Sequence, residues 1–307
     1  MKNIKFAGPL ATAVFLLLAG SLANAELAKT QGYGKILWGY LETLCGFGPR
    51  NPGGEGHRRA REFIKETGLK YADGVTEQKF VYPLSNGGEL PMVNVEFLFN
   101  GREEGRPILI GTHYDTRPYA DEEPDLVLHS QPILGANDGG SGVAVLLGLA
   151  RYLSEHKPRR PVRLVFFDGE DFGPRFSMEM FLGSKHYAAQ LIGRDKKEWP
   201  FCVVIVDMVG DKELEIFKEI NSEKSASWLT GAIFRAAGKL GLPQFRDSIK
   251  HAVLDDHTAF LRLDIPSAAV IDFDYPHWHR LSDTLDKCSP ESLSAVFSAV
   301  AAALDEI

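Results

Sequence analysis

Short apolar runs recur along the chain between polar, turn-rich segments. Most are rich in branched or aromatic side chains, which is the pattern of a buried strand. We therefore expect strands at 78–82, 92–99, 107–111, 162–167, 201–206, 214–217 and 268–271. Apolar residues three and four positions apart predict helices at 31–45, 57–67, 143–156, 180–191, 228–240 and 291–307. The charged residues at 57–62 are expected to face solvent.

The segments at 107–111, 143–156 and 162–167 form a strand–helix–strand unit, which favours parallel pairing of the two strands. Strands and helices alternate through the rest of the chain, and we find no internal repeat or interior linker. The expected fold class is α/β: a single three-layer α/β/α domain with a mixed, mostly parallel central sheet. This domain is expected to span residues 26–307.

The N-terminus has the features of a cleavable signal peptide. Lys2 and Lys5 precede an apolar stretch, and Ala23-Asn24-Ala25 fits a small-x-small cleavage site. We therefore interpret residues 1–25 as a signal peptide and expect a secreted or periplasmic protein without stable membrane insertion after cleavage. The alternative is an uncleaved membrane anchor. The apolar run is short for a membrane-spanning helix, which argues against this alternative.

Charge and cysteine content exclude some classes of function. The formal charge is −7, and removal of residues 1–25 takes away two lysines and no acidic residue, which makes it −9. A mildly acidic chain without a basic stripe is not expected to bind nucleic acid. Cys45, Cys202 and Cys288 allow at most one disulfide within a monomer, so the chain is no disulfide scaffold. The oligomeric state stays open.

Potential metal ligands lie at the ends of the expected strands and at the start of a helix. They are His113, Asp138, Glu170, Asp171, Asp207 and His279. Ligands of α/β proteins bind beyond the carboxyl ends of the strands, and His with carboxylate is the ligand set of a catalytic zinc. Singly, His113 could be a core histidine, and Asp138 and Asp207 could be caps. Together they predict a zinc site, with Asp138 as the natural bridge to a second metal.

Five motifs around these residues resemble one family. They are GTHYDT (111–116), GANDGGSG (135–142), FFDGED (166–171), VDMVG (206–210) and WH (278–279). In this order they are similar to the zinc exopeptidase family of bacterial aminopeptidases and glutaminyl cyclases. Within it, the segment LDDHTAFLRLDIP (254–266) and Trp278-His279 look more like the cyclases, as does Phe176-Ser177, where the cyclases have Trp-Ser.

The resemblance implies a set of metal ligands and a base. Zinc would be bound by Asp138, Asp171 and His279, and Glu170 would be the general base. Among these metal ligands, Asp171 departs from the family pattern, because the family usually has Glu at this position. An Asp is one methylene shorter, so either the metal or the backbone has to move.

The resemblance also implies roles in proton transfer and in substrate binding. Asp207 and Asp255 would form a supporting proton network. The substrate pocket would be walled by Trp278 and Phe176, with Tyr275 as a third aromatic.

Three functions follow from this resemblance. The first is zinc-dependent cyclisation of an N-terminal Gln on a peptide or protein, with release of ammonia. The second is an aminopeptidase, in which His113 and Asp207 complete a second metal site and Glu170 activates a metal-bound water. The third is a non-catalytic binding module on the same fold, against which the intact Glu170 and the complete ligand set argue.

Overall fold

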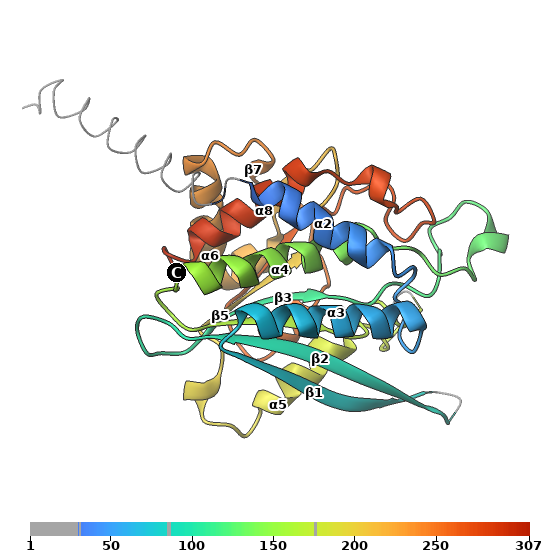
Figure 1. The fold of residues 1–307 in the computed structure, drawn as a ribbon, viewed down its shortest axis with the longest axis horizontal. Coiled ribbons are helices and arrows are strands. Elements are labelled where there is room, and N and C mark those ends of the chain that lie inside the picture. The colour runs from blue at the N-terminus through green and yellow to red at the C-terminus, as the bar shows by residue number, and fades with distance from the viewer. Residues whose placement is uncertain (1–29, 31, 85–86, 175–176) are drawn as a thin grey trace, which may run out of the picture.

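A twisted six-stranded sheet forms the middle of the molecule, with strands in the order β1-β2-β4-β3-β5-β8 (Figure 1). The computed structural model describes residues 30, 32–84, 87–174 and 177–307. The strands are β1 (Gly74–Pro83), β2 (Glu89–Phe99), β3 (Ile108–His113), β4 (Val162–Phe167), β5 (Cys202–Asp207) and β8 (Ser267–Ile271). A separate two-stranded sheet pairs β6 (Ile216–Lys218) with β7 (Phe245–Ile249).

The direction of the strands decides where their ends meet. β3 lies parallel to both β4 and β5, and β5 lies parallel to β8. β2 is antiparallel to β1 and to β4, so the sheet is mixed. Register places His113 beside Phe167 and Asp207 beside Ile271. The carboxyl ends of four neighbouring strands therefore share one edge of the sheet.

Helices cover both faces of the sheet, as expected for three layers. One apolar core joins the sheet to α2 (Tyr33–Cys45), α3 (Glu55–Tyr71), α4 (Gly140–Glu155), α6 (Ile220–Lys239) and α8 (Pro290–Ala303). A second core joins the other face to α5 (Leu182–Leu191) and α7 (His257–Leu261). Along β4, Leu164 and Phe166 belong to the first core, whereas Val165 and Phe167 belong to the second. This alternation is the period of two that a strand imposes on its side chains. The expected fold class is confirmed.

The start of α4 lies directly against the sheet. A Cβ atom at Gly142 would collide with the Oγ1 of Thr112 and the carbonyl oxygen of Val206. Only a glycine lets the helix approach β3 and β5 this closely, and the approach brings Asp138 to the carboxyl edge of the sheet.

Some expectations about the elements are wrong. α6 begins at Ile220 rather than at 228, where the side chain of Glu219 accepts hydrogen bonds from the amides of Asn221 and Ser222. Its backbone leaves helical geometry at Ala226, so the expected helix corresponds to the part of α6 after this kink. β7 lacks an apolar run and α7 is a five-residue helix, so neither was expected. His57 does not face solvent: it is buried and contacts Asp168 through Nε2 at 2.7 Å.

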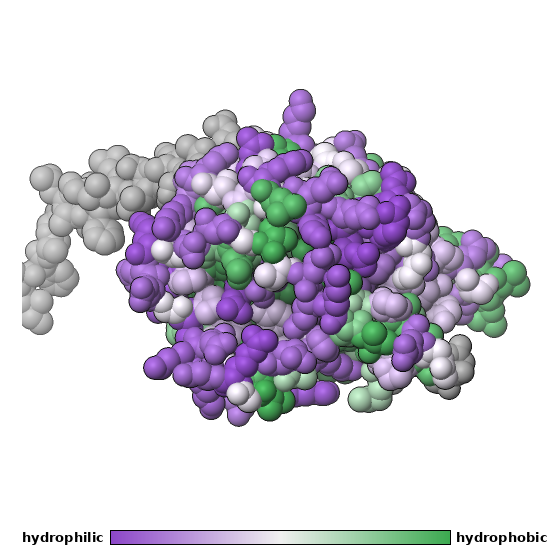
Figure 2. Space-filling view, turned by 60° about the horizontal axis from the view of Figure 1, so that its bottom comes forward, coloured by the Kyte–Doolittle hydropathy of each residue, from purple (hydrophilic) through white to green (hydrophobic). Residues whose placement is uncertain are grey.

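The surface in Figure 2 is mostly hydrophilic, with hydrophobic groups confined to small areas. Cys45, Cys202 and Cys288 are all free thiols. The interpretation of residues 1–25 as a signal peptide lies outside the described residues. Among the residues that are described, no helix is both long and apolar enough to cross a membrane.

Candidate metal centre and active site

The structure brings the expected ligands together from separate parts of the chain. His113 ends β3 and Asp207 ends β5, while Glu170 and Asp171 follow β4 by three and four residues. Asp138 precedes α4 and His279 follows β8. All six side chains are buried. They meet because the parallel strands end at one edge.

These residues form two groups that share Asp138. In the first, the Nε2 atom of His279 lies 3.3 Å from Asp171 Oδ1 and 3.6 Å from Asp138 Oδ2. In the second, His113 Nε2 lies 3.2 Å from Asp138 Oδ1 and 3.1 Å from Asp207 Oδ1. In each group the potential ligand atoms lie within 4.8 Å of one another. The two oxygens of Asp138 thus face different groups.

The chemistry of the first group fits a zinc ion. Two carboxylates and an imidazole are zinc ligands, and a three-ligand site leaves a position for substrate. Asp138 Oδ2 and Asp171 Oδ2 are buried without a hydrogen-bond partner among the described residues. Unpaired buried carboxylate oxygens are costly, and a bound cation would remove that cost.

The buried carboxyl groups of the site perturb one another. Burial and the charge of Asp171 raise the pKa of Asp138 to about 6. The same two causes raise the pKa of Glu170 well above its ordinary value. Burial alone would raise the pKa of Asp171, but His279 and Arg117 outweigh it and lower the pKa. The pKa values of these two adjacent residues are therefore shifted in opposite directions. The raised pKa suits Glu170 as a proton acceptor, and the lowered pKa suits Asp171 as an anionic ligand.

Charge also raises the pKa of both histidines. Burial opposes protonation of His279, but Asp171 and Asp121 raise its pKa to about 9. For His113, burial is outweighed by the carboxylates of Asp207 and Glu170, and its pKa is raised well above the ordinary value. A metal would have to displace these protons, so binding is coupled to pH.

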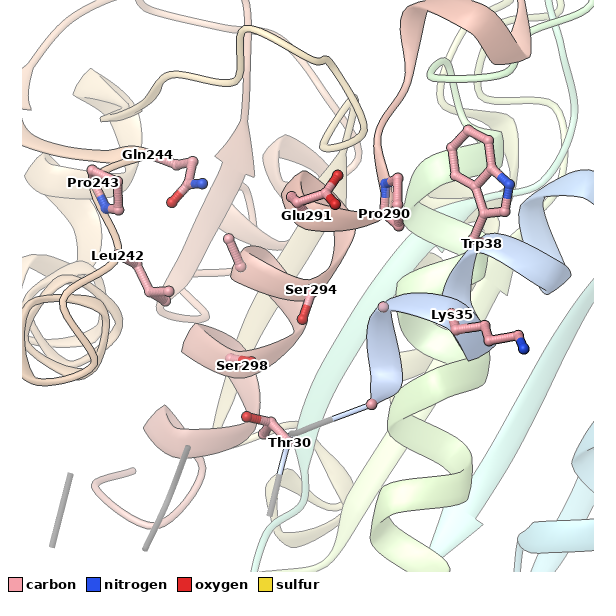
Figure 3. Close-up of a pocket in the computed structure, with 13 residues that line it drawn as sticks. Thr30, Lys35, Trp38, Leu242, Pro243, Gln244, Pro290, Glu291, Ser294 and Ser298 are labelled. Atoms are coloured by element: carbon pink, nitrogen blue, oxygen red, sulfur yellow. The ribbon is translucent and has the colours of Figure 1, made fainter. Parts of the chain in front are cut away.

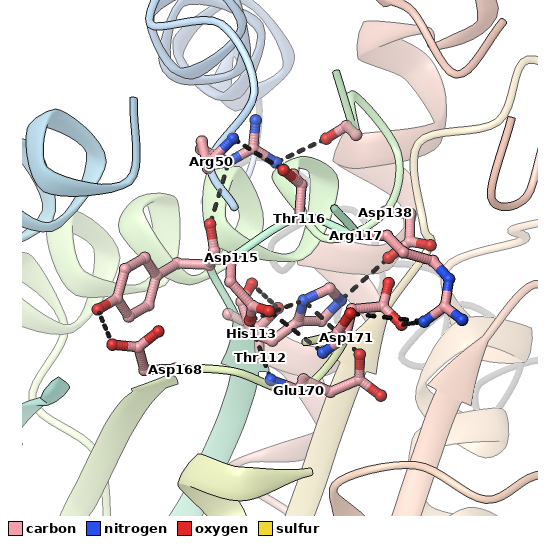
Figure 4. A network of polar contacts seen from close by, with 12 residues as sticks. Arg50, Thr112, His113, Asp115, Thr116, Arg117, Asp138, Asp168, Glu170 and Asp171 are labelled. Carbon is pink, nitrogen blue, oxygen red and sulfur yellow. Dashed lines mark hydrogen bonds and ion pairs between the residues drawn. The ribbon is translucent and has the colours of Figure 1, made fainter. Parts of the chain in front are cut away.

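Asp115 holds the loop after β4 in place. Its carboxylate accepts hydrogen bonds from the amides of Glu170 and Asp171, both at 3.1 Å. It also lies 3.5 Å from Nδ1 of His113. Figure 4 shows Asp115 in the same network of polar contacts as His113, Glu170 and Asp171. The sequence pattern predicts no role for Asp115, although this residue lies inside the GTHYDT motif.

Arg117 and Asp121 connect two of the three ligands of the first group, Asp171 and His279. The guanidinium of Arg117 donates to Asp171 Oδ1 at 3.2 Å (Figure 4). Through two nitrogens it also donates to Asp121, at 2.8 and 2.6 Å. Asp121 Oδ1 in turn lies 3.5 Å from His279 Nδ1. Orienting the second nitrogen of a ligand histidine in this way tunes a metal site. No sequence signal indicated this role, because both residues lie in a long polar loop.

The remaining expected site residues are in different surroundings. Glu170 lies outside both ligand groups, with Oε2 3.9 Å from His113 Nδ1. Asp255 is buried, and burial together with the charge of Asp207 raises its pKa to about 7. The hydroxyl of Tyr275 donates to Asp283 at 2.7 Å. Phe176 lies outside the described residues.

A cavity of about 40 Å³ opens onto the first ligand group. Its polar side is formed by Asp138, Glu170, Asp171, Asp207 and His279, and its apolar side by Met180, Met208, Val253, Leu254, Ile271, Phe273 and Trp278. The ring of Trp278 lies 4.0 Å from that of His279, centre to centre. Tyr275 is not among the described residues that line the cavity.

A second, larger cavity of about 790 Å³ lies between α2, α8 and the segment after α6 (Figure 3). The charged residues in its lining are Lys35 and Glu291, so it offers no comparable chemistry.

Fold and site together define a class of protein: a metal-dependent α/β enzyme whose centre lies at the carboxyl edge of a mostly parallel sheet. Residues 87–304 match Peptidase family M28, and the chain belongs to that family. The resemblance inferred from the motifs is confirmed.

Known proteins of this kind are similar over most of the chain. A Zn-dependent exopeptidase from Parabacteroides distasonis is 28% identical with a TM-score of 0.83, covering 89% of this chain and 98% of that one. The glutaminyl cyclase of Tannerella forsythia is 31% identical with a TM-score of 0.82 and the same coverage. Aminopeptidase YwaD of Bacillus subtilis is 27% identical over 92% of this chain, which corresponds to 58% of YwaD. The chain is thus a zinc-dependent enzyme.

Proposed function

We propose that the chain is a glutaminyl-peptide cyclotransferase, which converts an N-terminal Gln of a peptide or protein to pyroglutamate and releases ammonia. The observation that carries this proposal is the group Asp138–Asp171–His279, with Glu170 beside it and Trp278 on the wall of the same cavity. The similarity to the glutaminyl cyclase of Tannerella forsythia supports the same function.

The residues suit each step of this reaction. Asp138, Asp171 and His279 would hold zinc, which when bound supplies a Lewis acid for the side-chain carbonyl of the substrate. Glu170 takes a proton from the α-amine as its nitrogen attacks the carbonyl carbon. Glu170 then gives this proton to the side-chain amide nitrogen, whose bond to the carbonyl carbon breaks as ammonia departs. A carboxylate with a raised pKa is suited to both transfers.

Asp255 and Asp207 support the proton transfer in this proposal. Asp255 carries a pKa of about 7 through burial and the charge of Asp207, so it can hold or release a proton near neutral pH. Asp207 lies 3.1 Å from His113, which restrains its carboxylate. We infer that Asp255 helps to orient the nitrogen of the substrate.

The shape of the cavity favours a small polar group next to an apolar wall. A volume of about 40 Å³ leaves room for the carboxamide at the end of a Gln side chain beside the ligands. Trp278 would cover its apolar stem. Leu254 and Phe273 are 70% and 38% exposed at the rim, where the following residues of the peptide would lie.

The second ligand group favours an alternative function. His113, Asp138 and Asp207 could hold a second metal, and two metals sharing a carboxylate suit an aminopeptidase in which Glu170 activates water. Aminopeptidase YwaD is a relative of this kind. In the cyclase, by contrast, His113 and Asp207 need only hydrogen-bond each other.

A peptide assay separates the two functions. The purified chain with zinc is incubated with a Gln-initiated and a Leu-initiated peptide, and both are followed by mass spectrometry. Loss of ammonia from the Gln peptide alone is the expected result. Release of free Leu would make the chain an aminopeptidase, and no change in either peptide would favour the non-catalytic binding module.

We also propose that residues 1–25 direct export and that residues 26–307 form the catalytic domain in the periplasm or outside the cell. The support is the basic and apolar pattern of this segment. N-terminal sequencing of the protein recovered from the periplasm or medium should begin at Glu26. An intact Met1 in a membrane fraction would contradict this proposal.

A further inference from the structure

We propose that Asp283, held by Tyr275, positions Asp138, the ligand that both metal groups share. The inference rests on the metal centre of the proposed function and goes beyond the residues that contact metal or substrate. It also gives Tyr275 a role other than that of a pocket wall.

Asp283 accepts hydrogen bonds from three consecutive backbone amides in the turn that carries Asp138. Its carboxylate accepts hydrogen bonds from the amide of Asn137 through Oδ1 at 2.9 Å and from that of Asp138 through Oδ2 at 3.1 Å. Its carbonyl oxygen accepts one from the amide of Ala136 at 3.3 Å. Asp283 is fully buried, so water does not compete for these bonds.

The turn is fixed from its other side as well. The side-chain oxygen of Asn137 accepts a hydrogen bond from the amide of Gly210 at 2.6 Å, which links the turn to the segment after β5. Since both sides of the turn are restrained, the backbone of Asp138 has little freedom. Its two carboxylate oxygens are thereby presented to His279 on one side and to His113 on the other.

Tyr275 orients the carboxylate of Asp283. Its hydroxyl donates to Oδ1 at 2.7 Å, and its ring packs in a small apolar cluster with Met208, Val253 and Ile271. Tyr275, the ligand His279 and Asp283 lie on one segment after β8. This segment therefore supplies the ligand His279 directly and, through Asp283, positions the ligand Asp138 on the other side of the site.

Zinc affinity of the purified chain tests this role. Competition with a chromophoric chelator gives the affinity of the wild type, Asp283→Asn and Tyr275→Phe. Asp283→Asn should weaken zinc binding by about 10- to 100-fold, the usual effect of removing a group that orients a metal ligand. Tyr275→Phe removes one hydrogen bond and should weaken it by about 2- to 10-fold, with an unchanged KM for peptide.

Asp272→Asn is the matched control. Asp272 is also buried and also accepts two backbone amides, those of Glu215 and Asp274 at 3.1 Å, but it touches no ligand. This variant should lower the melting temperature and leave zinc affinity unchanged. If Asp283→Asn binds zinc as the wild type does, or if Asp272→Asn loses as much affinity, the inference is overturned.

The outcome is separate from that of the proposed function, because zinc affinity is measured without a peptide. A chain that fails to cyclise Gln peptides would still show the loss of zinc in Asp283→Asn. If Asp283→Asn fails to fold, Tyr275→Phe decides: a raised KM with normal zinc affinity would return Tyr275 to the pocket wall and overturn its role here.

Discussion

Replacing Glu170 by Gln should remove catalysis and leave the metal site intact. The two side chains have nearly the same shape, so the packing around position 170 is preserved. The backbone N–H of residue 170 can still donate to the carboxylate of Asp115. Its backbone carbonyl oxygen can still accept a hydrogen bond from the amide of Phe181 at 2.7 Å. Glu170 belongs to neither ligand group. The substitution therefore removes the negative charge of the side chain and its ability to accept a proton.

The size of the effect follows from that property. Loss of a general base usually lowers the rate by about 10²- to 10⁴-fold, which corresponds to about 3–5 kcal/mol in the activation barrier. The loss should appear in kcat, because the contacts that bind the peptide are unchanged. Zinc content should stay equal to that of the wild type.

The assay combines ammonia release from a Gln-initiated peptide with zinc analysis of the same preparation. Glu213→Gln, at an exposed position, is the control for loss of a negative charge and should keep full activity. Activity of Glu170→Gln within threefold of the wild type would refute the role of Glu170 as base. A parallel loss of zinc would mean that Glu170 is a ligand.

Three further predictions concern a ligand, the pocket and stability. Asp171→Asn should weaken zinc binding by at least about tenfold in a chelator competition, because the first group then lacks one of its two carboxylates; unchanged affinity would exclude Asp171 as a ligand. Trp278→Ala should raise KM for Gln peptides by about 2- to 10-fold with normal zinc content, because an aromatic wall is lost; an unchanged KM would place the substrate elsewhere. Glu219→Gln should lower the free energy of unfolding at pH 7 by about 3 kcal/mol. Burial alone would raise the pKa of Glu219, but His257 and backbone amides hold it at about 2, against an ordinary value of 4.5. This stabilisation is complete above about pH 4.5 and is lost as the pH falls through 2. Urea denaturation curves of the variant and the wild type should therefore differ at pH 7 and converge at pH 2. A difference in stability that persists at pH 2 would contradict the assignment.

Much of the fold could be predicted because its central strands are buried on both faces. Such strands appear in the sequence as continuous apolar runs, and β3, β4, β5 and β8 were all expected. Elements with weaker patterns were missed. β7 is exposed along most of its length, and only Phe245 and Ile249 are apolar among its five residues.

The candidate ligands could also be predicted, because each lies next to an element with a strong pattern. Parallel strands bring their carboxyl ends to one edge, so residues more than 160 positions apart, such as His113 and His279, were expected to approach each other. The sequence by itself thus determined the fold class, the family and the residue types of the metal centre.

Only the tertiary structure decided how these residues are supported. It showed that Arg117 donates to Asp171 and that Asp115 accepts hydrogen bonds from the amides of Glu170 and Asp171. It also showed that the hydroxyl of Tyr275 donates a hydrogen bond to Asp283. Each of these contacts depends on the direction of a side chain in a loop, where no helical or strand period constrains it. Apolar patterns specify which elements pack together, but the partners of buried polar groups are chosen by hydrogen-bond geometry between distant segments, and that geometry exists only in the folded chain.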